Sequence, residues 1–283
     1  MRTLTAALTL VAATPFLAPA IPNAFGTPHA VSTAARHTAH EMTIYARDFA
    51  FDAPDTVPAG ITTIHLINKG AELHHVVLIR LSGGHTMADL GKAMASNGPP
   101  PKWATSVGGP NAPVPGGNAS ATLHLAPGSY AIVCFIPSAD GVAHVMKGMS
   151  RPLTVTGPDV VGPLPKSDVT VALVDYGFNV SRPFVAGHQV VRIHNAAMQD
   201  HEMFIVRLAP GKTVQDLTAW SEKMVGPPPA MPLGGVTALA PGQENEISVD
   251  FTPGQYGLVC FMPDMHDGKP HFAHGMTKAF TVS

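Results

Sequence analysis

The sequence predicts an all-β protein made of two tandem Greek-key β-sandwich domains, each with a short helical insertion. One observation is an internal repeat at an offset of 127 residues, as from His74 to His201. A solenoid unit spans only ~20–50 residues, so an offset this long indicates a duplicated domain. The other observation is composition, because 27 Gly and 28 Pro in 283 residues are typical of short strands joined by many turns.

The repeat extends along both halves of the chain. Pairs at the offset of 127 are Asp48 and Asp175, Asn68 and Asn195, His74 and His201, and Arg80-Leu81 and Arg207-Leu208. A one-residue deletion later in the second half reduces the offset to 126, which aligns Tyr130 with Tyr256. The match therefore covers whole domains rather than one motif.

The first residues are typical of an export signal. Met1-Arg2 is followed by a short apolar stretch and by the small residues 18–20 (APA), so residues 1–20 are predicted to be a Sec-type signal peptide. The apolar stretch is shorter than the ~20 residues of a spanning helix. We therefore expect a mature protein without a membrane span, located in the periplasm or outside the cell. Residues 21–41, rich in Ala, Thr and His and without periodicity, are predicted to be a flexible leader.

The two domains are predicted at residues 42–156 and 168–283, from short β-branched or alternating segments between Gly and Pro turns. The predicted strands are 43–46, 62–68, 76–81, 122–125, 130–135 and 153–156, then 169–173, 189–195, 203–208, 246–251, 256–261 and 280–282. One helix per domain is expected to open at Thr86 and at Thr213, because an Asp three residues later completes a capping box. Residues 157–167, with three prolines, form the predicted linker.

One run of residues near the end of each domain contains both cysteines of the chain. Nine residues separate Cys134 from His144, and ten separate Cys260 from His271. A Met follows each of these His residues after four more, and another His lies far upstream. The two sets are His74, Cys134, His144 and Met149, and His201, Cys260, His271 and Met276. A thiolate, two imidazoles and a thioether form the ligand set that selects copper in a trigonal electron-transfer site.

These motifs resemble those of the cupredoxins, the family of plastocyanin, azurin and the copper nitrite reductases, over nearly all of both predicted domains. Asn68 and Asn195 precede the upstream His by six residues, as in a plastocyanin-type N…H motif, and both domains contain G-x-Y-x-x-x-C…H-x-x-x-G-M. The resemblance implies one type 1-like copper site per domain, with the Met as axial ligand. It also implies electron exit through His144 and His271, on loops expected near the surface.

The chain departs from the family in its long interval between Cys and His, which only the nitrite reductases approach. Those enzymes carry a His immediately before the Cys, which links the electron-transfer copper to a catalytic one, whereas this chain has Val133 and Val259 there. The sequence also lacks the H-x-H pairs of multicopper oxidases. We therefore expect neither nitrite reductase nor multicopper oxidase activity, and no catalytic residues.

Other interpretations of the cysteines remain open. Cys134 and Cys260 could form one disulfide, although bridging requires Cα atoms within ~7 Å and the two occupy equivalent positions in separate domains. They could also be buried apolar residues of a copper-free fold. His75 and its repeat equivalent Glu202 follow the upstream His, so strand alternation predicts that His75 is a surface residue.

Composition and motifs together predict the class of function. Only 13% of residues are charged and the formal net charge is -2, so the chain offers no basic field for nucleic acid. We expect an exported protein that binds one or two copper ions and passes single electrons to a redox partner protein. One alternative is a copper-handling protein without a redox role, which the soft donors Met262, Met265 and His266 favour. The other is a metal-free cupredoxin-fold module that binds a protein or small ligand.

Overall fold

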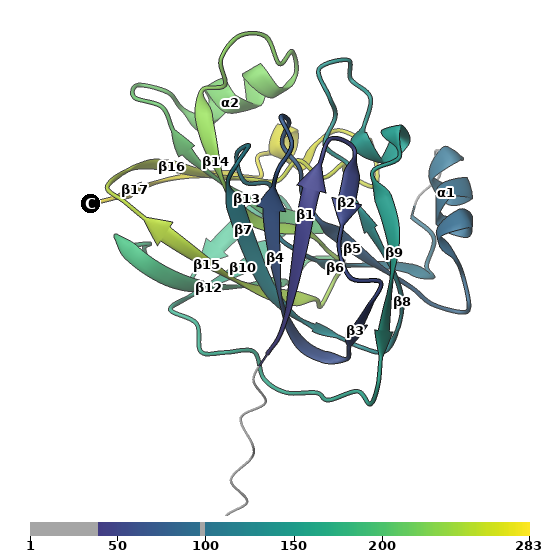
Figure 1. The fold of residues 1–283 in the computed structure, drawn as a ribbon. Coiled ribbons are helices and arrows are strands. Elements are labelled where there is room, and N and C mark those ends of the chain that lie inside the picture. Colours follow the sequence, from purple (N-terminus) through teal and green to yellow (C-terminus); the bar gives the residue numbers. More distant parts are fainter. Residues whose placement is uncertain (1–38, 97–99) are drawn as a thin grey trace, which may run out of the picture. The chain divides into compact units, whose positions relative to one another are not determined.

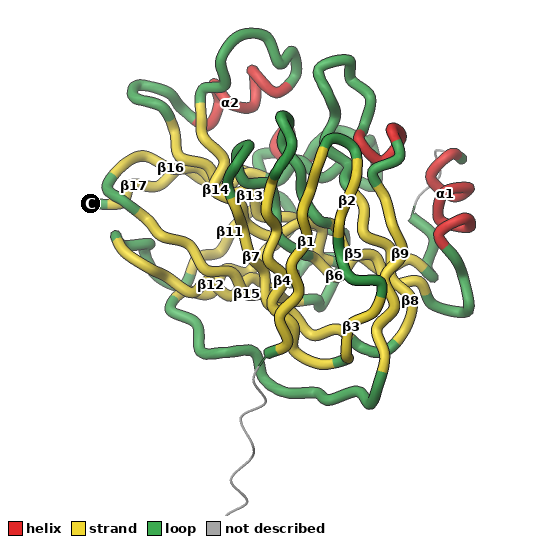
Figure 2. Tube along the Cα trace, viewed as in Figure 1, coloured by secondary structure: helices red, strands yellow, loops and turns green. Residues whose placement is uncertain are grey.

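Strands dominate the fold, which confirms the all-β prediction (Figures 1 and 2). The computed structural model describes residues 39–96 and 100–283, and the predicted signal peptide and most of the predicted leader lie outside these ranges. In the described residues, 17 strands are accompanied by two α-helices and two short 3-10 helices. No helix in this part of the chain is long and apolar enough to cross a membrane.

The elements follow the same order in both halves, except that the first half has one additional short strand after its second strand. The first half contains β1 (His40–Arg47), β2 (Ala50–Asp52), β3 (Thr56–Pro58), β4 (Gly60–Asn68), β5 (Val77–Leu81), α1 (Met87–Ala95), β6 (Ala104–Gly108), β7 (Asn118–Leu125), β8 (Gly128–Val133), η1 (His144–Lys147) and β9 (Ser150–Thr156). The second half contains β10 (Val169–Val174), β11 (Gly177–Val180), β12 (Gly187–Asn195), β13 (His201–Leu208), α2 (Val214–Ser221), β14 (Ala230–Leu239), β15 (Glu244–Phe251), β16 (Gly254–Val259), η2 (His271–His274) and β17 (Thr277–Val282).

The strands form two sheets, and each sheet contains strands from both halves. The eight-stranded sheet has the order β11-β10-β12-β15-β7-β4-β1-β2, and the nine-stranded sheet has the order β17-β16-β13-β14-β6-β5-β8-β9-β3. The halves join where β7 pairs with β15 and β6 pairs with β14, both antiparallel. Because each junction joins equivalent strands of the repeat, the halves meet in the way that the subunits of a two-fold symmetric dimer meet.

Strand β14 and its counterpart β6 were missed by the sequence prediction, and the composition of β14 explains why that strand was missed. The sequence of β14, AMPLGGVTAL, contains a Pro and two adjacent Gly, which are unusual inside a strand. Gly234 and Gly235 have φ of 99° and 122°, and the pairing with β13 shifts register along this stretch. These irregularities bend the strand, so its sequence lacks the regular alternation from which strands are predicted.

Residues 39–41 are the only part of the predicted leader that the structure describes, and there the structure corrects the prediction. Strand β1 begins at His40, inside the range 21–41, and pairs in parallel with β4 from His40 opposite Thr62 onward. The side chains of Glu41 and His65 form a hydrogen bond across these two strands. Backbone pairing with β4 therefore orders residues whose composition alone suggests a flexible segment.

Two clusters of buried apolar side chains fill the space between the sheets, one in each half. Cys134 and Met149 belong to the first cluster and Cys260 and Met276 to the second. Alternate residues of each strand face inward, as in other sandwiches with two aligned sheets. The sulfur atoms of the predicted ligands are thus set into the two main cores.

The helices cover the opposite face of the nine-stranded sheet. In the first half, Leu90 of α1 packs in a cluster with Val77 and Ile79 of β5. In the second half, Leu217 of α2 packs with Val206 and Val259. The helices are therefore separated from the metal-ligand candidates by the sheet.

Both helices begin as the sequence predicts. The hydroxyl of Thr86 accepts from the backbone N–H of Asp89 at 3.3 Å, and the Asp89 carboxylate accepts from the Thr86 N–H at 2.9 Å. Thr213 and Asp216 form the same reciprocal pair at 3.1 and 2.7 Å. The two capping boxes are confirmed.

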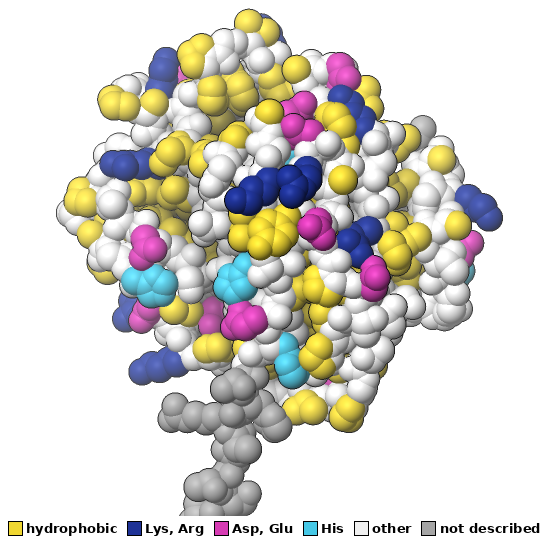
Figure 3. Space-filling model, viewed as in Figure 1, with side chains coloured by type: hydrophobic (Ala, Val, Ile, Leu, Met, Phe, Trp, Pro, Cys, Tyr) yellow, Lys and Arg dark blue, Asp and Glu magenta, His cyan; other side chains and the backbone are white. Residues whose placement is uncertain are grey.

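Charged side chains are scattered over the face of the molecule in Figure 3. Lys and Arg side chains lie singly or in small groups among apolar and uncharged ones. This distribution agrees with the low proportion of charged residues in the chain.

Leu239 tests the importance of the junction between the halves. It is fully buried at the end of β14, opposite Val107 of β6. We expect Leu239→Ala to lower the free energy of unfolding by ~2–5 kcal/mol, because it leaves a cavity in a packed core. Urea unfolding measures this loss. Met231→Ala, on the same strand but exposed, should change stability by no more than ~0.5 kcal/mol. Equal effects of the two substitutions would contradict a packed junction.

Candidate metal centres

The predicted ligands approach one end of each sandwich from different elements. His74 lies in the loop before β5, and its counterpart His201 opens β13. Cys134 and Cys260 directly follow β8 and β16, and the downstream His residues open the 3-10 helices η1 and η2. The structure brings together His74, Cys134 and His144 in the first half and His201, Cys260 and His271 in the second, with ligand atoms within 4.8 Å of one another in each set.

The Asn of each N…H motif fixes the loop that carries the upstream His. In the first half, the Asn68 amide donates to the carbonyl of Glu72 at 2.8 Å and accepts from the N–H of Gly70 at 2.9 Å. Asn195 makes the equivalent bonds to Gln199 and Ala197 at 2.8 and 2.9 Å. A buried amide that bridges both ends of the loop limits where the following His can lie.

The loop from the Cys to the following His has the same backbone hydrogen bonds in both halves, although the loop of the second half is one residue longer. The N–H of His144 donates to Ile136 O at 2.9 Å, and that of His271 donates to Met262 O at 2.8 Å. Each 3-10 helix then ends at a Gly with φ of 99°, a left-handed conformation that Gly adopts without strain. The additional residue of the second loop therefore lies before η2, where it does not displace the His.

Three donor atoms meet closely in the first half. The Nδ1 atoms of His74 and His144 are 3.1 Å apart, and the Cys134 Sγ lies 3.4 Å from the His144 Nδ1. Donor atoms placed ~2.0–2.3 Å around one ion are themselves about 3–4 Å apart. The spacing of the three donors fits a single metal ion.

The second half repeats this arrangement. The Nδ1 atoms of His201 and His271 are 2.9 Å apart, and the Cys260 Sγ lies 3.3 Å from the His271 Nδ1 and 4.0 Å from the His201 Nδ1. All six side chains are buried with 0% exposure. A metal bound at either position would be shielded from water.

Carboxylates hold the far nitrogens of both His residues in the first half. The Nε2 of His74 lies 2.7 Å from Asp48 Oδ1, and the Nε2 of His144 lies 2.9 Å from Glu72 Oε2. The pKa of Asp48 is lowered, chiefly by the backbone N–H of Ala71, and His74 adds to the effect. Burial acts to raise the pKa of Glu72, but the hydrogen bond from His144 helps to bring it below its usual value. Both carboxylates are therefore charged acceptors for an imidazole N–H.

These carboxylates determine which nitrogen faces the cysteine. A neutral imidazole carries one proton, and if Nε2 donates that proton to a carboxylate, Nδ1 presents only a lone pair. In the first half, two rings in this tautomer would direct their Nδ1 lone pairs at each other across 3.1 Å, with no proton between them. A cation between them resolves this contact, so the residues present fit a metal ion.

In the second half, only one of the two His rings has a carboxylate partner at Nε2. Asp175 accepts from His201 Nε2 at 3.0 Å, but the buried His271 Nε2 has no hydrogen-bond partner, and the nearest carboxylate oxygen, of Asp264, is 3.8 Å away. Gln199 occupies the position equivalent to Glu72, and its amide donates to Asp264 instead. Burial lowers the pKa of His271 to about 4, which keeps its ring neutral. The tautomer of this ring is thus less firmly fixed than that of His144.

The thiols are protonated in the metal-free protein. Burial raises the pKa of Cys134 to about 12, and it also raises the pKa of Cys260. A metal ion must therefore displace a proton from each sulfur, as is usual for thiolate ligands. Both cysteines are free in the structure, so the interpretation that they form a disulfide is not supported.

The two predicted axial methionines are buried beside the cysteines. The carbonyl of Met149 accepts from the Cys134 N–H at 3.3 Å, and that of Met276 accepts from the Cys260 N–H at 3.2 Å. Both Met side chains are fully buried within the cores that contain the sulfur atoms of the cysteines. Their role as ligands stays a prediction.

The rings of His144 and His271 are fully buried, although the loops that carry them reach the surface at the exposed Met146 and Met265. The expectation that His75 is a surface residue was wrong. His75 is also buried, with 8% exposure, and the next residue contacts the second half, because the Val76 carbonyl accepts from the Thr237 hydroxyl at 2.9 Å. The His75 Nε2 accepts from the N–H of Phe135 at 2.9 Å, and burial lowers the pKa of His75 to about 3.

Sequence reasoning missed several residues around the centres. Asp48 and Asp175 were visible as a repeated pair, but nothing in the sequence connected them to His74 and His201. Glu72 had no such signal, because its counterpart in the second half is Gln199.

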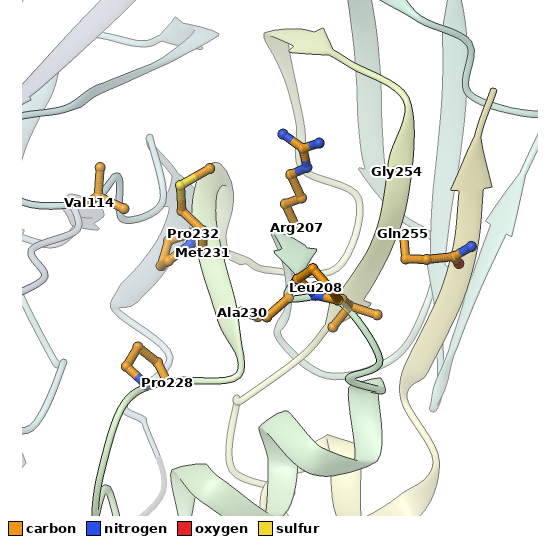
Figure 4. Close-up of a pocket in the computed structure, with 11 residues that line it drawn as sticks. Val114, Arg207, Leu208, Pro228, Ala230, Met231, Pro232, Gly254 and Gln255 are labelled. Atoms are coloured by element: carbon orange, nitrogen blue, oxygen red, sulfur yellow. The ribbon is translucent and has the colours of Figure 1, made fainter.

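Two other features of the described residues lie apart from these centres. Asp264, Asp267 and His274 form a third group of potential ligands, which is already linked internally by a 3.2 Å contact between the imidazole and Asp267. An open groove of about 630 Å³ is lined mainly by apolar residues and Pro, with Arg207 and Gln255 at its edge (Figure 4). Arg207 lies near the end of β13 opposite His201, so the groove is distant along this strand from the second centre.

Comparison with known proteins gave similarities to solved structures only. No protein-family model matches the chain, and no curated protein matches it. A reduced auracyanin from Roseiflexus castenholzii is 25% identical over 42% of this chain and 98% of its own, with a TM-score of 0.30. A blue copper oxidase and a copper nitrite reductase, both from Nitrosomonas europaea, are 15% and 13% identical over 87% of this chain and 86% and 94% of theirs, with TM-scores of 0.26.

The strand order of each half and the convergence of two His and a Cys at one end of the sandwich agree with the predicted family resemblance. The fold is cupredoxin-like. Its two halves form one compact unit over the described residues, with one His/Cys/His group in each half.

Glu202 gives a prediction about pH. Burial raises its pKa to about 7 from an ordinary value of 4.5. Between these two pKa values the folded protein binds more protons than the unfolded chain. The contribution of protonated Glu202 to the free energy of unfolding is therefore complete below about pH 4.5 and is lost as the pH rises through 7. Relative to Glu202→Gln, the metal-free wild type should lose about 3 kcal/mol of stability between about pH 4 and pH 8.

Chemical denaturation across this pH range measures the difference. Glu222→Gln, an exposed substitution of the same type, should follow the wild-type pH dependence. If the difference between wild type and Glu202→Gln stays constant with pH, the shifted pKa of Glu202 is refuted.

Proposed function

We propose that this protein is an exported copper-binding cupredoxin-like protein that carries single electrons, with one copper centre in each half. The observation that carries the proposal is the meeting of two imidazole Nδ1 atoms and one sulfur within 4.8 Å, twice in the same chain. When bound, copper supplies reversible one-electron chemistry between its two common oxidation states. Two nitrogens and a thiolate, with a thioether nearby, are the donors that select copper for this purpose.

The surrounding residues support electron transfer by limiting movement. Asp48 and Glu72 fix the two rings of the first centre, and the backbone bonds of η1 fix the position of His144. Ligands that are held in place by such contacts rearrange little when the charge of the bound ion changes. Burial of all donors also excludes water from the centre.

The two centres should differ in copper affinity. In the first centre both far nitrogens have carboxylate partners, whereas His271 in the second centre has none. Loss of such a partner at a metal-ligating His typically weakens metal affinity by ~10–100-fold. We therefore infer that the first centre, built on Cys134, binds copper more tightly than the second.

We propose a carrier rather than an enzyme. Val133 and Val259 stand before the cysteines, where a nitrite reductase has the His that links its two coppers, and both valines are buried in apolar clusters. A redox partner protein would dock near the ligand loops. The exposed Met146 and Met265 (66% and 65%) lie on these loops and provide apolar contact area. The predicted signal peptide supports export to the periplasm or beyond.

Copper titration of the mature protein tests this function. We expect two bound ions per chain and an intense visible thiolate-to-copper absorption. Cys134→Ser and Cys260→Ser should each lose about half of the absorption, and the double variant should lose all of it, because each sulfur serves one centre. Optical spectroscopy and metal analysis on the same samples give the result.

Two outcomes separate the alternatives. Copper-binding protein with a thiolate band but without reversible exchange of electrons with a mediator would indicate copper handling instead. Absence of the band at any copper loading would leave a metal-free module and would contradict the proposal.

A further inference from the structure

Three positions around the outward nitrogen of the downstream His differ between the halves in a related way. In the first half, Glu72 accepts from the Nε2 of His144 at 2.9 Å. In the second half, the carboxylate lies instead on the loop that follows the Cys. The equivalent sets are Phe49, Glu72 and Ser138 in the first half, and Tyr176, Gln199 and Asp264 in the second.

One oxygen of Asp264 lies among three possible donors. The Tyr176 hydroxyl donates to Asp264 Oδ2 at 2.6 Å, and the Gln199 amide donates to the same atom at 3.0 Å. The His271 Nε2 is 3.8 Å from this oxygen, beyond hydrogen-bonding distance, and has no other partner among the described residues. Two other side chains therefore occupy the oxygen that lies nearest to His271.

The second oxygen of Asp264 anchors the carboxylate to its own loop. Asp264 Oδ1 accepts from the backbone N–H groups of His266 and Asp267 at 2.8 and 3.2 Å, and the residue is only 4% exposed. Turning about this anchor moves Oδ2 alone. The gap between Oδ2 and the His271 Nε2 is about 0.8 Å longer than an ordinary N–H···O bond of ~3.0 Å, so a small turn closes it.

Tyr176 reaches Asp264 from beside the His271 ring. The rings of Tyr176 and His271 pack edge to face, with centroids 5.7 Å apart and planes at 76°. In the first half, Phe49 packs against His144 in the same way, at 5.1 Å and 63°. A ring without a hydroxyl therefore satisfies the packing at this position, and the hydroxyl of Tyr176 has a separate effect.

The missing bond at Nε2 changes where the single proton of the neutral His271 ring is held. The His201 Nε2–H donates to Asp175 at 3.0 Å, which leaves the His201 Nδ1 as an acceptor. The His271 Nδ1 lies 2.9 Å from that acceptor. A proton on the His271 Nδ1 thus has a partner, whereas a proton on its Nε2 has none, and the proton occupies the atom that faces Cys260.

We propose that Tyr176 is a positioning residue that holds Asp264 away from His271 and so lowers the copper affinity of the second centre. The inference rests on the proposed copper function and deepens it, because it names the side chain that makes the two centres unequal. A metal ion can bind the His271 Nδ1 only after the proton leaves this atom. An acceptor at Nε2 would hold the proton there and leave the Nδ1 lone pair free.

NMR of the imidazole nitrogens in the metal-free protein tests the contact. We expect the His271 proton on Nδ1 in the wild type and on Nε2 in Tyr176→Phe, because Asp264 is then free to accept from His271. His144 is the internal reference in each spectrum, since its Nε2 already faces Glu72 and should carry the proton in both proteins.

Copper affinity tests the consequence. It is measured by chelator competition in the Cys134→Ser background, where only the second centre remains. Tyr176→Phe should tighten binding by ~10–100-fold, the usual effect of such a partner on a ligating His. Adding Asp264→Asn should abolish the gain. Its amide oxygen can still accept from the loop N–H groups, and its NH₂ group then faces His271, where it cannot accept.

Tyr256→Phe is the matched control. It removes a hydroxyl from a buried Tyr of the same half, where that hydroxyl donates to Thr252 O at 2.7 Å, and Tyr256 packs in the same core as Cys260. This substitution should change neither the position of the His271 proton nor the copper affinity of the second centre.

Three results overturn the inference. They are an unchanged His271 proton in Tyr176→Phe, a gain in affinity that survives Asp264→Asn, and the same gain in Tyr256→Phe. The NMR measurement uses no copper, so the two failures are distinguishable. Absence of copper binding at any loading contradicts the proposed function and, with it, the effect on affinity. Normal copper binding with an unchanged proton position refutes only the role of Tyr176.

Discussion

The candidate centres depend on hydrogen bonds made by the outward nitrogens of the imidazoles. Asp48 and Glu72 accept hydrogen bonds from the Nε2–H groups of His74 and His144, which leaves the two Nδ1 lone pairs facing each other, with that of His144 beside Cys134. Two acceptors and a buried thiol packed this closely are unfavourable in an empty apolar core and favourable around a cation. The tautomer chosen by the carboxylates thus explains why the first half fits a metal. His271 has no hydrogen-bond partner at Nε2, so its tautomer is less firmly fixed and the second half is less well prepared for a metal ion.

The junction between the halves adds a constraint that a pair of separate domains would lack. Equivalent strands pair across it in both sheets, so the two cores are held in fixed relation. His75 and Glu202 occupy this junction and touch the cysteine segments from behind. Glu202 also accepts from the Asn111 amide, so a residue of the first half contacts a support of the second centre.

The sequence predicted the fold class, both capped helices and the residues that converge in each half, because a repeat reveals any pattern that both copies preserve. Asn68 and Asn195 illustrate this, since their spacing to the His reflects a loop that the amide bridges. The roles of His74 and His201 as metal ligands stay a prediction. Features that depend on tertiary context were not predictable. Strand alternation placed His75 at the surface because nothing local shows that another half covers it, and Glu72 lacks a repeat counterpart.

X-ray absorption at the copper edge of the loaded protein tests the central claim most directly, because it reports the atoms bound to the metal. We predict that each copper is bound by one sulfur atom at short distance and by two imidazole nitrogens. Because the ligands are held rigidly, the distances from copper to these atoms should change by no more than about 0.1 Å on reduction. A shell of nitrogen and oxygen atoms without sulfur would contradict the account.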